Sequence, residues 1–169
     1  MLGKLQTSDK VVLLRRITVN EALNSPQILI TTNKTNIQRL FYHRWISDVS
    51  SLTDDFIATR LNKSGLLSNG VIRSSSAAYP DYIIEPHLIN MVAHSSLNNV
   101  TEENFVTIEI KVDLLRRDTN NNLQIVHSNT YKQTYIRNNQ EIKYISDAYS
   151  KIFSITVDNI IADLSNILN

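Results

Sequence analysis

Apolar and polar residues alternate in the second half of the chain, which predicts long β-strands. Within residues 104–117, every second position from 106 to 114 is apolar, namely Val106, Ile108, Ile110, Val112 and Leu114. A period of two places these side chains on one face of a strand and the intervening polar side chains on the other. A polar turn at residues 118–122 follows and residues 123–136 run back, so we expect a long antiparallel hairpin with one face in water.

Polar turns separate the remaining strand candidates. These candidates are residues 10–19, 27–32, 37–42, 70–74 and 81–93. Pro26 favours an extended conformation for the residue before it, and this starts the strand at Gln27 after a segment, residues 20–24, that could form one helical turn. The polar residues 32–36 predict a turn, so the strands on either side of it should form a second hairpin.

Two segments repeat apolar residues every three or four positions, which predicts amphipathic helices. The first begins near Asp48, where Ser47 or Asp48 can accept free backbone N–H groups as an N-cap. It ends before Gly65, whose left-handed conformation can close the last turn. The second spans residues 141–167. Its apolar stripe is broad enough to pack on a sheet and consists of Ile145, Tyr149, Ile152, Thr156, Ile160, Leu164 and Ile167.

Together these elements predict an α+β protein. We expect a largely antiparallel or mixed sheet of six to seven strands, with two main helices packed on one face. The chain has 169 residues, of which 42% are hydrophobic and 20% charged, so it can bury an ordinary core without metals or disulfides. We expect residues 1–9 to form a polar N-terminal tether and residues 10–169 to form a single globular domain.

Charge and composition exclude several classes of partner and site. The formal net charge is +1 and basic residues are interspersed with acidic ones, so the sequence does not indicate the basic face that nucleic-acid binding requires. The chain has no cysteine, which excludes disulfides, thiol nucleophiles and thiolate metal sites. No apolar run approaches the roughly 18 to 20 residues of a membrane-spanning helix, so we expect the chain as written to be soluble.

Few residues are arranged for catalysis. The histidines are far apart and lack the spacing of metal ligands, so we predict neither a metal nor a cofactor; they are His43, His87, His94 and His127. Glu85 and His87 share a strand face and could form the acid–base pair of a hydrolase. Charged residues on a half-exposed strand more often contact water. We therefore predict that the protein is not an enzyme.

Aromatic and arginine side chains are concentrated where residues 37–42 lead into the first helix. The cluster consists of Phe41, Tyr42, Arg44 and Trp45. Because Trp and Arg are over-represented among binding hot spots, this cluster is the candidate interface. The alternative is structural: Trp45 would cover the core between helix and sheet, and Arg44 would pair with a carboxylate.

The order of motifs around this cluster resembles that of a known family. Residues Ser25-Pro26-Gln27-Ile28 open a strand, the pair Arg44-Trp45 follows, and an amphipathic helix begins near Asp48. This arrangement is similar to that of the auxiliary lipoproteins of ABC-type transport systems, including the paraquat-inducible protein C type. The resemblance covers roughly residues 13–168.

The resemblance implies a non-catalytic function in a bacterial transport system. It implies ABC transporter components and an MCE-type substrate-binding protein as partners, in the traffic of lipid or hydrophobic compounds across the periplasm. It also implies a precursor with a lipid-modified cysteine, so we expect this chain to be the mature periplasmic domain of a protein anchored to the outer membrane. Lipid binding and a homo-oligomer are compatible with the resemblance. The main alternative is a domain that binds a small apolar ligand between its helices and its sheet.

Overall fold

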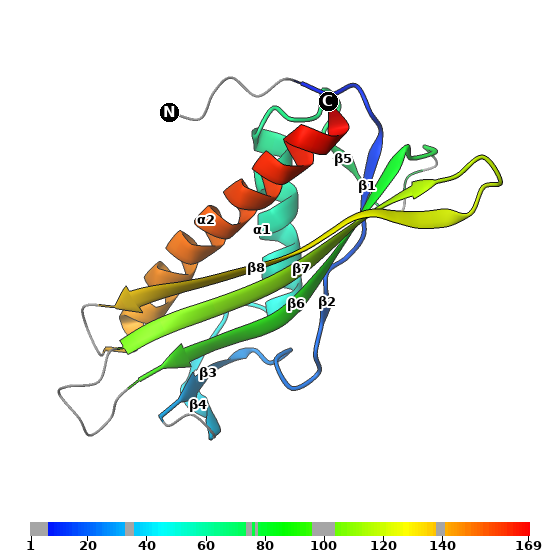
Figure 1. Ribbon diagram of the computed structural model, residues 1–169. Helices are drawn as coiled ribbons and strands as arrows, with labels where there is room; N and C mark the ends of the chain where they lie inside the picture. Colours follow the sequence, from blue (N-terminus) through cyan, green and yellow to red (C-terminus); the bar gives the residue numbers. More distant parts are fainter. Residues whose placement is uncertain (1–6, 33–35, 74–75, 77, 96–103, 138–140) are drawn as a thin grey trace.

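The computed structural model describes residues 7–32, 36–73, 76, 78–95, 104–137 and 141–169. Two helices lie on one face of a mixed sheet, which confirms the predicted α+β class (Figure 1). The helices are α1 (Val49–Lys63) and α2 (Lys143–Leu168). The strands are β1 (Val12–Leu14), β2 (Thr18–Val19), β3 (Gln27–Thr31), β4 (Ile37–Arg44), β5 (Val71–Ile72), β6 (Tyr82–His94), β7 (Asn104–Arg117) and β8 (Leu123–Arg137).

Strand β6 organises the sheet because it has partners along both edges. On one edge it pairs antiparallel with β7, which in turn pairs antiparallel with β8. Its other edge is shared by β1, β2 and β3, which all run parallel to it. β5 lies beyond β1, and β4 lies beyond β3. Among the described strands, β4 and β8 are therefore outer strands with one edge unpaired.

The segment predicted as one strand at residues 10–19 forms two, so the described sheet has eight strands rather than six to seven. Between β1 and β2, the backbone N–H of Ile17 donates to Oδ1 of Asp54 on α1, at 3.0 Å. The same N–H is then unavailable to the sheet. A helix side chain that is distant in sequence thus interrupts the strand, and the local pattern of residues gives no sign of it.

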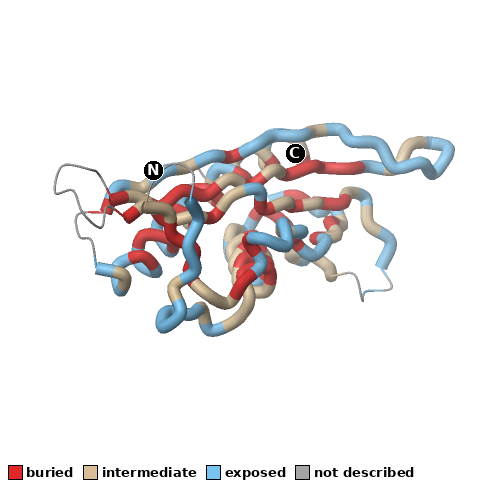
Figure 2. The backbone as a smooth tube through the Cα atoms, turned by 90° about the horizontal axis from the view of Figure 1, so that it is seen from below, coloured by how far each residue is buried: buried red, intermediate tan, exposed pale blue. Residues whose placement is uncertain are grey.

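The core lies between the helices and the inner face of the sheet. The predicted stripe of α2 is confirmed, since Ile145, Tyr149, Ile152, Thr156, Ile160 and Leu164 are buried and Ile167 is partly buried. The alternating apolar residues of β7 are also buried. Strand β8, in contrast, is exposed along most of its length (Figure 2).

Helix α1 begins and ends as its sequence predicts. The N-cap is Asp48, whose Oδ1 accepts the backbone N–H of Ser51 at 2.8 Å and the hydroxyl of Ser50 at 2.6 Å. These hydrogen bonds from Ser50 and Ser51 lower the pKa of Asp48. Gly65, just past the helix, has a φ of 73°. The fixed start of α1 places residues 45 and 46 immediately before its first turn.

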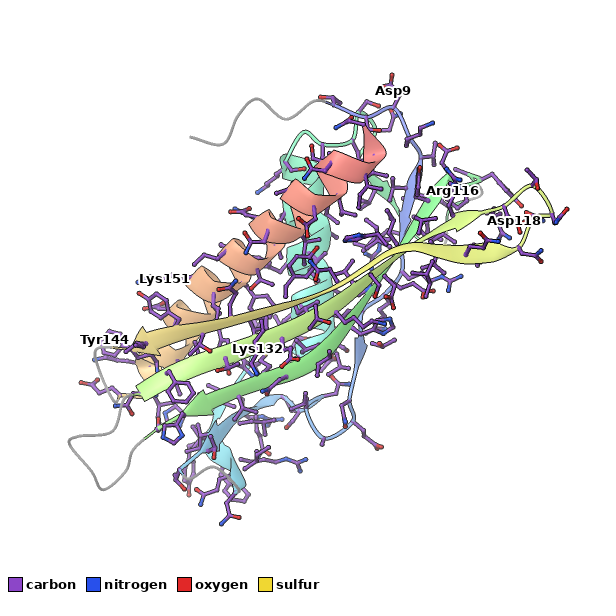
Figure 3. The ribbon with its side chains drawn as sticks, viewed as in Figure 1. Asp9, Arg116, Asp118, Lys132, Tyr144 and Lys151 are labelled. Carbon is purple, nitrogen blue, oxygen red and sulfur yellow. The ribbon has the colours of Figure 1, made fainter. Side chains whose placement is uncertain are left out.

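The β7–β8 hairpin extends beyond the helices as an arm, with Arg116 and Asp118 towards its end (Figure 3). Its turn is the one predicted at residues 118–122. Oδ1 of Asp118 accepts the backbone N–H groups of Asn122 and Asn120, each at 2.8 Å, and these bonds lower the pKa of Asp118. Asn121 has a φ of 65°, in the left-handed region that asparagine tolerates.

Candidate functional site

The predicted hairpin of β3 and β4 is present, and it contains a large bulge in β4. Leu29 pairs with Arg39, and two residues earlier on β3, Gln27 pairs with Arg44. The four residues 40–43 of β4 therefore lie opposite Ile28 alone. The backbone N–H of Trp45 donates to the carbonyl of Pro26 at 2.6 Å, so pairing resumes directly after the bulge. Residues 40–43, which we call the β4 bulge, are fastened at both ends.

The β4 bulge displays large apolar side chains to solvent. Phe41 is 79% exposed and Tyr42 is 97% exposed, whereas Leu40 packs partly against the core. Ile46, which follows the hairpin, is 96% exposed. Single exposed apolar residues are ordinary on protein surfaces, but neighbouring ones on an unpaired outer strand are typical of a binding surface.

The other two residues of the predicted cluster have different surroundings. Arg44 is exposed on β4, and no described carboxylate lies within ion-pair distance of it. Trp45 is half-buried, and its ring meets the ring of Tyr149 on α2 edge-on, with centroids 5.7 Å apart. The cluster is thus divided between surface and core: Phe41, Tyr42 and Arg44 face solvent, while Trp45 contacts the helix layer.

A cavity of about 230 Å³ lies behind Trp45, between the two helices and the sheet. Apolar side chains from four segments line most of it. They are Trp45 and Ile46, Leu52 and Phe56 of α1, Met91 of β6, and Tyr149 and Phe153 of α2; Thr53, Ser146 and Ser150 complete the lining. The sequence singles out Trp45 and allows, as an alternative, a small apolar ligand between the helices and the sheet, but it does not predict which other residues line this cavity. The aromatic residues at helical spacing, Tyr149 and Phe153, were the one available signal.

Aromatic contacts define the walls of this cavity. The rings of Phe56 and Phe153 are 5.6 Å apart between centroids, and those of Tyr149 and Phe153 are 6.5 Å apart. Burial raises the pKa of Tyr149 and so further favours its neutral phenol. Together with Trp45, these rings surround the cavity with apolar surface and no charged side chain lines it.

The predicted acid–base pair has separate partners in the structure. Glu85 forms an ion pair with Arg15. His87 instead shares a hydrogen bond with the hydroxyl of Thr18 through Nδ1, and its Nε2 lies 3.5 Å from Asp113. Each group is thus engaged by a neighbour on the sheet, and the cavity between the helices contains neither of them. Within the described residues, no three His, Cys, Asp or Glu side chains are grouped as metal ligands would be.

Neither helix in the described part of the chain has both the length and the apolar character needed to cross a bilayer. The candidate binding surface comprises the β4 bulge and residues 45 and 46, which follow one another along the chain, together with the cavity that residues 45 and 46 help to line. Phe41, Tyr42 and Arg44 remain a predicted interface.

Solved structures similar to this chain support the fold. Protein XCC0632 from Xanthomonas campestris has a TM-score of 0.81 with 14% identity, covering 94% of this chain and 85% of that one. The hypothetical protein CT253 from Chlamydia trachomatis has a TM-score of 0.53 with 10% identity, covering 90% of this chain and 96% of that one. No curated protein matches the sequence.

A family match identifies the chain more closely than these structures do. The family described as ABC-type transport auxiliary lipoprotein component matches residues 3–136. The match includes both strands of the β3–β4 hairpin, helix α1 and nearly all of the sheet. Because it covers most of the chain, the protein belongs to the family of ABC-type transport auxiliary lipoprotein components.

Proposed function

We propose that this protein is a non-catalytic component of an ABC transport system that moves lipid or other hydrophobic compounds, and that it holds an MCE-type partner through the β4 bulge. Membership of the auxiliary lipoprotein family supports the link to ABC transport. The observation that supports docking is the exposure of Phe41 and Tyr42, at 79% and 97%, in a bulge fastened at both ends.

The physical reason for proposing an interface is that covering the exposed apolar side chains of the β4 bulge would lower the free energy. Covering an aromatic side chain removes a large apolar area from water, and such residues contribute most of the binding energy at protein interfaces. Because the bulge is paired on both sides, little conformational freedom is lost when a partner binds it. The unpaired edge of β4 can also offer backbone hydrogen bonds to a partner strand.

The charges beside the bulge indicate the kind of surface that fits. Arg39, His43 and Arg44 are exposed on the same strand as Phe41 and Tyr42. A partner surface with an apolar centre and acidic groups around it would complement this arrangement. We propose that the precursor is tethered by an N-terminal lipid to the outer membrane from the periplasmic side, which would raise the local concentration of this domain near its partner.

The test measures binding of the purified chain to the MCE-type protein of the same transport system. Phe41→Ala and Arg44→Ala should each weaken association by about 1 to 3 kcal/mol, because each removes part of the exposed contact surface. Ile125→Ala is the matched control, since Ile125 is a 59% exposed apolar residue on β8. Its affinity for the partner should equal that of the wild type.

Melting curves followed by circular dichroism complete the test, because a docking residue should leave the melting temperature unchanged. Unaltered affinity in both Phe41→Ala and Arg44→Ala would rule out the β4 bulge as the docking surface. A lowered melting temperature of Arg44→Ala with normal affinity would assign Arg44 to the stability of the fold instead.

A further inference from the structure

The cavity between α1 and α2 is bordered by helix–helix contacts on one side and by exposed residues on the other. Towards the C-terminal ends of the helices, the Phe56–Phe153 contact and the ion pair of Arg60 with Asp158 hold α1 and α2 together. Elsewhere the lining includes Ile46, which is 96% exposed, and two exposed serines, Ser146 and Ser150. A ligand could therefore enter beside Ile46 and place a polar group near the serine hydroxyls.

The chemistry of the lining selects an uncharged apolar group. Seven of the ten lining residues are apolar or aromatic, and the hydroxyl of the buried Thr53 already donates to the carbonyl of Val49 at 2.7 Å. Water is held poorly in such a space because it needs several polar partners. An alkyl chain needs none, and burying it removes apolar surface from water.

The volume of the cavity decides between candidate occupants. A cavity of about 150 Å³ holds benzene, so the about 230 Å³ observed here has room for more than one benzene-sized group. Pockets that enclose a whole drug-sized ligand measure about 300 to 1,000 Å³. The space therefore fits a segment of one alkyl chain, and it is too small for an entire two-chain lipid.

We propose that this cavity binds the alkyl chain of a single-chain amphiphile, or one acyl chain of a lipid, with the polar head outside near Ser146 and Ser150. This inference rests on the proposed function in one respect: the alkyl chain belongs to the class of lipid or hydrophobic compound that the transport system would move. The binding site itself does not involve the β4 bulge or a partner protein.

Trp45 provides a direct readout, because it lines the cavity and is the single tryptophan in the sequence. The probes are alkylphosphocholines used as monomers, in a series that differs by two methylene groups per step, with a bromine at the end of the chain to quench fluorescence on contact. Each step should tighten binding about tenfold until the cavity is full, and binding should then level off.

Ser150→Phe should block the cavity, since Ser150 lies at its exposed rim on α2. We expect it to weaken binding of the best probe by at least about tenfold, while melting by circular dichroism stays at the wild-type temperature. The matched control is Ser165→Phe, the same substitution on the same helix at a residue outside the lining. It should bind the probe as the wild type does.

Three results would overturn the proposal. The first is the absence of Trp45 quenching by every probe in the series. The second is equal quenching in Ser150→Phe and Ser165→Phe, which would place the alkyl chain elsewhere. The third is loss of partner binding in Ser150→Phe without any binding of the probe to the wild type, which would assign the cavity to a side chain of the partner.

The failure of this inference can be told apart from the failure of the proposed function. Probe binding is measured on the purified chain without a partner, whereas docking is measured with the Phe41→Ala and Arg44→Ala variants. Probe binding in a chain that does not recognise the MCE-type protein would leave the cavity assignment intact and refute the docking surface alone.

Discussion

The buried carboxylate of Asp113 is surrounded by residues from three neighbouring strands. It is 5% exposed on β7, where Lys111 donates to it at 2.8 Å, Ser128 of β8 donates to its other oxygen, and His87 of β6 lies 3.5 Å away. Burial opposes ionisation of Asp113, but the hydrogen bonds from Lys111 and Ser128 and the nearby positive charge outweigh it, so its pKa is lowered. This carboxylate, rather than Glu85, is the partner of His87.

The lowered pKa predicts how stability depends on pH. A carboxyl group with a folded pKa below its unfolded value of about 3.9 stabilises the protein above that pH, and this contribution is lost as the pH falls through the folded pKa. We therefore expect Asp113→Asn to be less stable than the wild type at pH 7, with a difference that shrinks below about pH 4.

Urea unfolding at a series of pH values would measure this difference. The control is Asp55→Asn, which changes an exposed carboxylate on α1. A difference between Asp113→Asn and the wild type that stays constant from neutral to acid pH would mean that packing, and not the charge of Asp113, accounts for it.

At the scale of elements, the sequence predicts those whose pattern is long and regular. The bounds of β7 agree with the predicted residues 104–117, and the predicted α2 stripe is buried because a period of 3.6 residues over many turns selects one face. The break between β1 and β2 could not be predicted, since it depends on a bond between Ile17 and Asp54 on a distant helix.

Only part of the candidate site could be predicted from the sequence, because the rest of it depends on contacts between segments that are distant along the chain. Phe41, Tyr42 and Arg44 are noticeable as residue types, but their exposure depends on the bulge, which is a property of the pairing between β3 and β4. The cavity depends on four segments that meet only in the folded chain. Local patterns do not show which residues line such a space, although the pattern of residues 141–167 correctly places Tyr149 on the buried face of α2.

Because α2 packs on the sheet, truncating a buried residue of this helix should lower stability much more than truncating an exposed one. Ile152 is 1% exposed, so Ile152→Ala should destabilise the protein by about 2 to 5 kcal/mol through lost burial and a residual cavity. Ile155 on the same helix is 47% exposed, and Ile155→Ala should change stability by less than about 0.5 kcal/mol. Chemical denaturation measures both, and similar values for the two variants would contradict the packing of α2.

The whole molecule has two distinct ends. At one end, the hydroxyl of Thr7 donates to the carbonyl of Gly65 at 3.0 Å, and the hydroxyl of Ser8 donates to the carbonyl of Leu168 at 2.9 Å. These bonds place the first described residues beside the C-terminal ends of α1 and α2. The β3–β4 hairpin lies at the opposite end (Figure 1). A lipid attached at the N-terminus would therefore hold the first end near a membrane and direct the β4 bulge away from it.

This orientation can be measured because the chain has no cysteine, so a single introduced cysteine can be labelled selectively. Tyr42→Cys would report on the β4 bulge. Asn69→Cys would report on the opposite end, because Asn69 lies in an exposed turn next to Ser68, whose backbone N–H donates to the carbonyl of Ser8 at 3.0 Å.

Each labelled chain is attached through its N-terminus to vesicles that carry an energy-transfer acceptor on their headgroups. The six residues before Thr7 in this sequence span at most about 22 Å, so the Asn69 label should transfer energy to the membrane more efficiently than the Tyr42 label. Equal transfer from both labels would mean that the tethered domain has no preferred orientation, and stronger transfer from the Tyr42 label would mean that the β4 bulge faces the lipid.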